Sequence, residues 1–147
     1  KKSNYAAAIF LLAQIEADAG NLTEAIRNAE AAMLLAPQDV GAAFGVGILK
    51  YQKRDYAGAV AALERALALE SSYANARYFL GLSYARLGKY AKGAEQFKIL
   101  SDQNPGNKEV QMILKNLRAG RNPLEPPSAS APGKTTLKKK PPIEEGQ

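Results

Sequence analysis

The sequence predicts an all-α solenoid built from antiparallel helix pairs. The first observation is a fixed period, because a shift of 34 residues places Gly47 on Gly81 and Tyr56 on Tyr90. The second is that each period holds two stretches of helical apolar spacing with a turn between them. A helix–turn–helix unit that recurs in this way indicates a repeat array, in which each unit covers its apolar face by stacking on the next.

The recurrence divides the chain into three repeats, at residues 6–39, 40–73 and 74–107. In the first repeat the apolar spacing predicts one helix over residues 6–19 and a second that ends near Leu35. Gly20 suits the left-handed backbone that follows many helix C-termini. Asn21 is expected to cap the second helix, and Glu24 would complete a capping box.

The second and third repeats share the same plan. The second repeat predicts helices over residues 40–53 and 56–69, with Asp55 as the cap of the second helix. The third predicts helices over residues 74–87 and 90–101.

Small residues recur where the two helices of a repeat should cross. We expect Gly47 to lie against Ala59, and Gly81 against Gly93. A larger side chain at such a crossing would hold the two backbones apart. The gain from close packing is expected to offset the cost of glycine in a helix, which is about 1 kcal/mol relative to alanine.

Residues 108–119 predict one further amphipathic helix, which would cap the end of the repeat domain at residues 1–119. Residues 120–147 hold six of the eight prolines and few large aliphatic side chains. Such a segment cannot bury enough apolar surface to offset its ordering entropy, so a disordered Pro- and Lys-rich tail is predicted. Lys138, Lys139 and Lys140 lie in it, with two glutamates after them, which favours a solvated tail over an anion-binding site.

Residues 3–6 (SNYA) echo residues 71–74 (SSYA), the junction between the second and third repeats. Two interpretations are open: a repeat or another domain lies upstream of Lys1, or four common residues coincide.

The composition argues against several function classes. The chain has no cysteine and no histidine, so a thiol nucleophile and the usual hydrolytic triad are impossible. No metal-ligand cluster and no phosphate-binding glycine loop are present, so neither a metal nor a cofactor is expected. The net charge of +6 is spread thinly, which argues against nucleic acid. The longest apolar run, residues 5–13, is too short to span a membrane.

The third repeat carries a pattern of leucine, glycine, aromatic and proline residues, namely Leu80, Gly81, Tyr84, Gly88, Tyr90, Phe97 and Pro105. This pattern resembles the tetratricopeptide repeat family more than the pentatricopeptide repeats of similar length. The resemblance covers about residues 6–119 and implies a right-handed superhelix whose first helices line a concave groove.

By this resemblance, an aromatic position recurs in the groove as Phe10, Phe44 and Tyr78. Aromatic side chains on a rigid concave surface can anchor a peptide or a helix of a partner. The alternative is that they pack between neighbouring helices. The full set of expected partner-binding residues is Phe10, Leu11, Gln14, Asp18, Phe44, Ile48, Tyr51, Gln52, Asn75, Tyr78, Phe79, Leu82 and Arg86.

Chaperone-binding members of the family hold a C-terminal carboxylate with cationic and amide side chains at fixed groove positions. The matching residues here are Phe10, Gln14, Gly45, Asn75 and Phe79, none of which is cationic. The sequence therefore argues against a carboxylate clamp.

The sequence thus predicts a non-enzymatic scaffold that binds a peptide or helix of a partner protein in the groove. The alternative is a C-terminal accessory repeat region of a larger enzyme or membrane protein, such as a glycosyltransferase or a polytopic membrane protein, whose active part lies upstream of Lys1. A third possibility is self-association through the N-terminal end. The compartment stays open between a soluble cytoplasmic protein and one attached to a membrane protein upstream.

Overall fold

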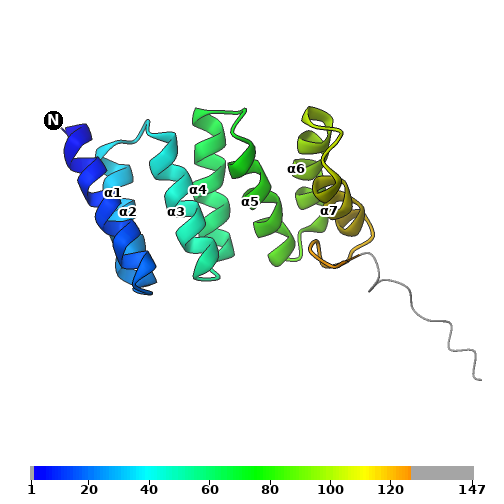
Figure 1. The fold of residues 1–147 in the computed structure, drawn as a ribbon, viewed down its shortest axis with the longest axis horizontal. Coiled ribbons are helices and arrows are strands. Elements are labelled where there is room, and N and C mark those ends of the chain that lie inside the picture. The colour runs from blue at the N-terminus through cyan, green and yellow to red at the C-terminus, as the bar shows by residue number, and fades with distance from the viewer. Residues whose placement is uncertain (1, 127–147) are drawn as a thin grey trace, which may run out of the picture.

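The computed structural model describes residues 2–126, and side chains from Asn4 onward. Over that part of the chain it consists of helices joined by short turns, with no strand. The helices follow one another in chain order along the length of the molecule, with α1 and α2 at one end and α6 and α7 at the other (Figure 1). Their bounds are α1 Lys2–Asp18, α2 Leu22–Leu35, α3 Val40–Gln52, α4 Tyr56–Leu69, α5 Ala74–Arg86, α6 Tyr90–Gln103 and α7 Lys108–Arg118.

The observed helices confirm the predicted helix pairs. Five of the seven helices end within one residue of the predicted limits at both ends. The exceptions are α1, which begins at Lys2 and not at residue 6, and α6, which continues to Gln103. Neither added stretch contains a glycine or proline, so nothing in the local sequence stops the helix there.

The turn inside each repeat contains one residue with left-handed backbone at the same repeat position. This residue is a glycine in two of the three repeats. Gly20 has φ 87° and Gly88 has φ 75°, whereas the equivalent residue of the second repeat is Arg54, with φ 66°. Asp55 then caps α4, because its Oδ1 accepts a hydrogen bond from the Gly58 N–H at 2.9 Å. The predicted side-chain cap at Asn21 is wrong. Asn21 precedes α2, but its side chain accepts no hydrogen bond from the first backbone N–H groups of the helix. The start of α2 is exposed, so these backbone N–H groups are accessible to water.

We expect Arg54→Gly to raise the free energy of unfolding by about 1 kcal/mol. A side chain with a Cβ is strained at positive φ, and glycine is not. The Arg54 side chain is exposed and makes no hydrogen bond or ion pair with the described residues, so little is lost when it is removed. Urea denaturation followed by circular dichroism measures the change, with Arg54→Ala as the control that removes the side chain and keeps the strain. Equal stability of the two variants would contradict this explanation.

Glycines do bring the paired helices together, although the residue nearest to Gly47 is not the one predicted. A Cβ on Gly47 would come within 2.7 Å of the Leu63 side chain, and one on Gly81 within 2.5 Å of the Phe97 ring. Gly93 lies against the backbone of α5, where a Cβ would come 2.8 Å from the carbonyl oxygen of Gly81. The large core side chains therefore sit over the glycines of the neighbouring helix, and one pair, Gly81 and Gly93, meets as expected.

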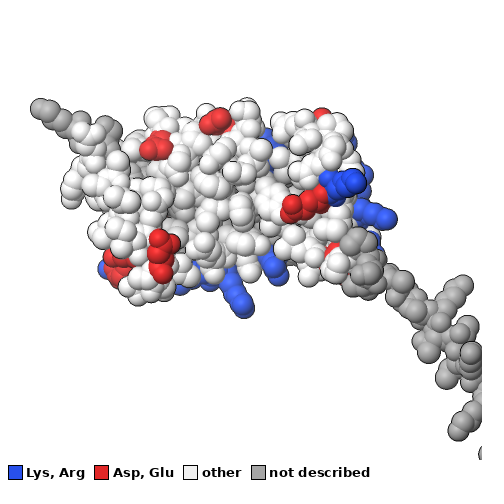
Figure 2. Space-filling model, viewed as in Figure 1, with Lys and Arg blue, Asp and Glu red and all other residues white. Residues whose placement is uncertain are grey.

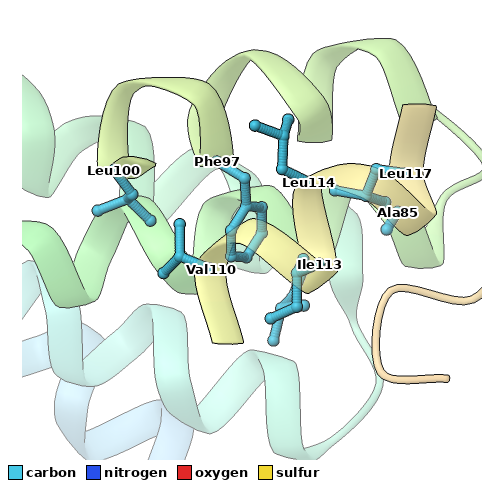
Figure 3. Packing of buried hydrophobic residues seen from close by; sticks show 8 residues of the cluster. Ala85, Phe97, Leu100, Val110, Ile113, Leu114 and Leu117 are labelled. Atoms are coloured by element: carbon cyan, nitrogen blue, oxygen red, sulfur yellow. The ribbon is translucent and has the colours of Figure 1, made fainter. Parts of the chain in front are cut away.

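The buried core forms three clusters, each shared by successive helices, and the C-terminal cluster is closed by α7. Phe97 of α6 is fully buried and points toward α7, with Val110 and Ile113 on either side of its ring (Figure 3). Leu114 and Leu117 of α7 complete this cluster. The apolar face of α7 thus covers the last repeat, as the predicted capping helix would.

Residues 120–126 take a defined path against α7, which differs from the prediction that the tail begins at residue 120. The Asn116 Nδ2 donates hydrogen bonds to the carbonyl oxygens of Pro123 at 3.1 Å and Glu125 at 2.9 Å. Arg121 in turn donates to Asn116 Oδ1 at 3.2 Å. The buried amide of Asn116 is the physical reason, because its polar atoms need partners. The rest of the predicted tail, 127–147, lies outside the described residues.

Candidate partner-binding groove

The first helices of the repeats form a surface that is hollowed between α1 and α3. This cleft has a volume of about 590 Å³. Phe10 lies on its α1 side, and Phe44 and Ile48 lie on its α3 side. All three side chains are half-buried, so they are held in place and still present surface to a partner. The complete lining is Phe10, Gln14, Ala17, Asp18, Gly41, Phe44, Gly45, Ile48, Leu49 and Gln52.

Gly45 positions the Phe10 ring in this cleft. A Cβ built on Gly45 would overlap the ring of Phe10, so the ring lies directly on the backbone of α3. Any larger residue at position 45 would push the ring away. The cleft therefore depends on a glycine inside a helix. Glycine lowers helix stability, and the space that it provides for the Phe10 ring explains its presence there.

The structure brings together six of the thirteen residues predicted to bind a partner. Leu11 lies beside them and is exposed, at the edge of a smaller neighbouring hollow of about 220 Å³. Asn75 and Arg86 are exposed on α5. The six residues in the cleft are Phe10, Gln14, Asp18, Phe44, Ile48 and Gln52.

The remaining four predicted residues pack against one another. Tyr78 lies edge-on to Phe79 at 5.4 Å and to Phe97 at 5.3 Å between ring centroids, and Phe79 lies edge-on to Tyr51 at 5.5 Å. Leu82 is only 4% exposed and offers almost no surface to a partner. For these residues the geometry fits the alternative that the aromatic side chains pack between neighbouring helices. The reason is that α5 has α3 on one side and α7 on the other, whereas α1 has a helix pair on one side only.

Phe44 both lines the cleft and packs against other aromatic side chains. Its ring lines the cleft and also contacts Tyr73 edge-on at 4.9 Å and Phe79 at 6.3 Å between centroids. The second repeat thus connects the cleft to the packed aromatic residues of the third.

Tyr78 is fixed further by a hydrogen bond from its hydroxyl to Glu109 Oε1 of α7, at 2.8 Å. Burial, and then the bond to the Glu109 carboxylate, raise the pKa of the Tyr78 phenol well above its ordinary value. The phenol therefore stays a neutral donor to Glu109 and ties α5 to the capping helix.

The cleft carries almost no charge. Asp18 is the one ionisable side chain among its described lining residues, and it lies at the rim, exposed to solvent. Most cations in the view of Figure 2 lie elsewhere, along the lower edge and at the α6–α7 end. The cleft suits uncharged apolar side chains, with the amides of Gln14 and Gln52 available for hydrogen bonds.

Sequence reasoning missed the small residues of the cleft. Gly41 and Gly45 lie four apart in α3 and form part of its lining. The family pattern directs attention to large side chains, whereas the space itself is made by small ones. Two glycines on one face of a helix were the available signal, since each lowers helix stability.

A second hollow, of about 520 Å³, lies between α6 and α7. Its lining includes Glu95, Lys98 and Arg118, and Lys98 is paired with Asp102 at 2.7 Å. This mixture of charges at an exposed surface is weaker support for an apolar binding site than the lining of the α1–α3 cleft.

Stacked helix pairs with glycine-mediated close packing and a terminal capping helix define a helical repeat protein of the solenoid class. The profile of the family described as "Tetratricopeptide repeat" matches residues 10–61 and 44–108. The chain therefore belongs to the tetratricopeptide repeat family.

Solved structures confirm the fold. The structure of the first TPR of Spaghetti (RPAP3) bound to the HSP90 peptide SRMEEVD superposes with a TM-score of 0.73 at 20% identity, over 80% of this chain and 93% of that one. The second TPR domain of human RPAP3, in complex with the HSP70 peptide SGPTIEEVD, gives 0.74 at 18% identity, over 80% and 98%. The MamA protein gives 0.73 at 26% identity, over 80% of this chain and 64% of that one. No curated protein sequence matches the chain significantly.

Proposed function

We propose that this chain is a non-enzymatic protein-interaction module that binds an apolar segment of a partner protein in the cleft between α1 and α3. The observation that carries the proposal is the largely apolar hollow, with Asp18 as its one charged lining residue, where Phe10 rests on Gly45 beside Ile48. Half-buried aromatic and aliphatic side chains in a preformed hollow are the usual anchors of protein recognition. Within residues 2–126, no helix has the length and apolar character needed to cross a membrane.

The partner segment should present aromatic or aliphatic side chains and should not depend on a terminal carboxylate. The two RPAP3 domains above are in complex with peptides that end in Glu-Val-Asp. A carboxylate would need cationic donors, and the equivalent positions of this chain offer none. The lining supports insertion of one or two apolar side chains flanked by backbone groups that bond to Gln14 and Gln52.

The test starts from a random peptide library displayed on phage and selected against the full chain. The selected peptides are then synthesised, and their affinity for cleft variants is measured by fluorescence polarisation. We expect Phe10→Ala and Ile48→Ala each to weaken binding by about 10-fold or more, since truncating an anchor in a pocket costs more than about 1.4 kcal/mol. The matched control is Leu34→Ala, which truncates an exposed side chain on α2, outside the cleft.

Circular dichroism of each variant separates loss of binding from loss of fold. Selected peptides that are mainly acidic, or that bind Phe10→Ala and Ile48→Ala as tightly as the unchanged chain, would contradict the proposal. An equal loss in Leu34→Ala would place binding on another surface.

A further inference from the structure

The outer face of α1, on the side away from the other helices, is apolar, and none of the described residues covers it. Tyr5, Ala8, Leu12 and Ile15 succeed one another at helical spacing along it. All four are exposed, and Leu12 and Ile15 expose 46% and 58% of their surface. None of them lines the α1–α3 cleft, so this α1 outer face is a separate surface.

The repeats themselves show what this face is built for. Leu12 corresponds to Val46 in α3 and Leu80 in α5, which are 1% and 3% exposed. Ile15 corresponds to Leu49, which is also buried. The same register position is therefore a helix-packing position in both internal repeats.

A helix covers the corresponding faces of α3 and α5. Val46 and Leu49 share a buried cluster with Ala25 and Ala29 of α2. Leu80 in turn shares a cluster with Leu63 of α4. The α1 outer face continues this series of helix–helix interfaces, so the surface that it fits is another apolar helical face.

The lack of charge and the spacing of the four side chains favour α1 of a second copy as the helix that covers this face. The four side chains are uncharged, so two copies of the face meet without ionic repulsion. Their spacing of three, four and three residues reads the same in both directions. In an antiparallel pair Tyr5 therefore lies opposite Ile15 of the other copy, and Ala8 lies opposite Leu12, which places small against large.

The other end of the molecule does not offer a matching surface. The exposed residues of α7 include Lys108, Gln111, Lys115 and Arg118, which are polar or cationic. A head-to-tail contact would bury these groups against the apolar α1 face. A two-fold contact between like faces avoids this cost and closes after two copies.

We propose that two copies of this chain associate through their α1 outer faces, as an antiparallel α1–α1 pair about a two-fold axis. A single helix pair is a small interface, so the association is concentration-dependent and not permanent.

Sedimentation velocity of the full chain, between roughly 5 and 500 µM, tests the association. The mass is expected to rise from 15.7 kDa toward twice that value with concentration. Leu12→Glu and Ile15→Glu should each weaken dimerisation more than 10-fold, because each buries a carboxylate against an apolar face. Leu34→Glu places the same charge on an exposed leucine of α2 and should leave dimerisation unchanged. Circular dichroism confirms that the variants are folded.

The absence of cysteine in the chain makes the orientation testable by cross-linking. A short bis-maleimide should join Ala8→Cys to Leu12→Cys in an equal mixture more readily than it joins Ala8→Cys to itself. Preferential cross-linking of Ala8→Cys to itself would overturn the antiparallel arrangement. A chain that stays monomeric at the highest concentration, or a Leu12→Glu variant that dimerises like the unchanged chain, would overturn the proposal as a whole.

Discussion

Replacing Phe97 with alanine is expected to lower the free energy of unfolding by about 3–5 kcal/mol, the usual range for an aromatic side chain deleted from a core. Phe97 is fully buried and lies over Gly81 of α5, against Tyr78 and the apolar face of α7 (Figure 3). Its removal leaves a cavity at the point where α5, α6 and α7 meet. The residue beneath the ring is Gly81, which has no side chain that could occupy part of this space.

Urea denaturation followed by circular dichroism at 222 nm measures this loss. The control is Ile99→Ala in the same helix, whose side chain is partly exposed and should cost about 1 kcal/mol or less. Similar losses for the two variants would show that Phe97 does not hold the last repeat together. Because solenoid repeats contact only their neighbours, the decrease in stability should be greatest in α5, α6 and α7.

The second large effect is expected from Gly93→Val, which should destabilise the fold by more than about 2 kcal/mol. A Cβ at position 93 would come 2.8 Å from the carbonyl oxygen of Gly81, and backbone cannot turn away as a side chain can. The two helices would have to separate, which would also loosen the packing of Phe97.

The matched control for this change is Ala91→Val, at an exposed position of the same helix. It introduces the same β-branched side chain and should cost only about 0.5 kcal/mol through helix propensity. If the two valine variants had equal midpoints of denaturation, the close approach of α5 and α6 would not matter for stability.

Most of the fold could be predicted because it depends on local and periodic signals. Helical spacing and a recurring register, with Pro37 before α3 and the cap Asp55 before α4, suffice to place Val40 at the start of α3 and Tyr56 at the start of α4. Details that depend on a third element could not be predicted in this way. The side chain that lies nearest to Gly47 is Leu63, where Ala59 was predicted, since the side chain that fills a crossing depends on rotamers and on the height of each helix.

The candidate site was predicted less completely than the fold. The register correctly placed Phe10 and Ile48 on one surface, because groove positions repeat with the helices. It could not tell that Tyr78 and Leu82 are enclosed by α7, since their burial depends on how the capping helix packs against the last repeat. It also overlooked Gly45, whose contribution is space and not contact.

The central claim is that the cleft between α1 and α3 binds the partner, and nuclear magnetic resonance tests it most directly. The ¹⁵N-labelled chain of 15.7 kDa is titrated with a selected peptide, and amide shift changes are mapped by residue. The proposed function predicts that the largest changes cluster at Phe10, Gln14, Gly45, Ile48 and Gln52. Changes that cluster instead at Ala91, Lys98 and Arg118, around the hollow between α6 and α7, would contradict it.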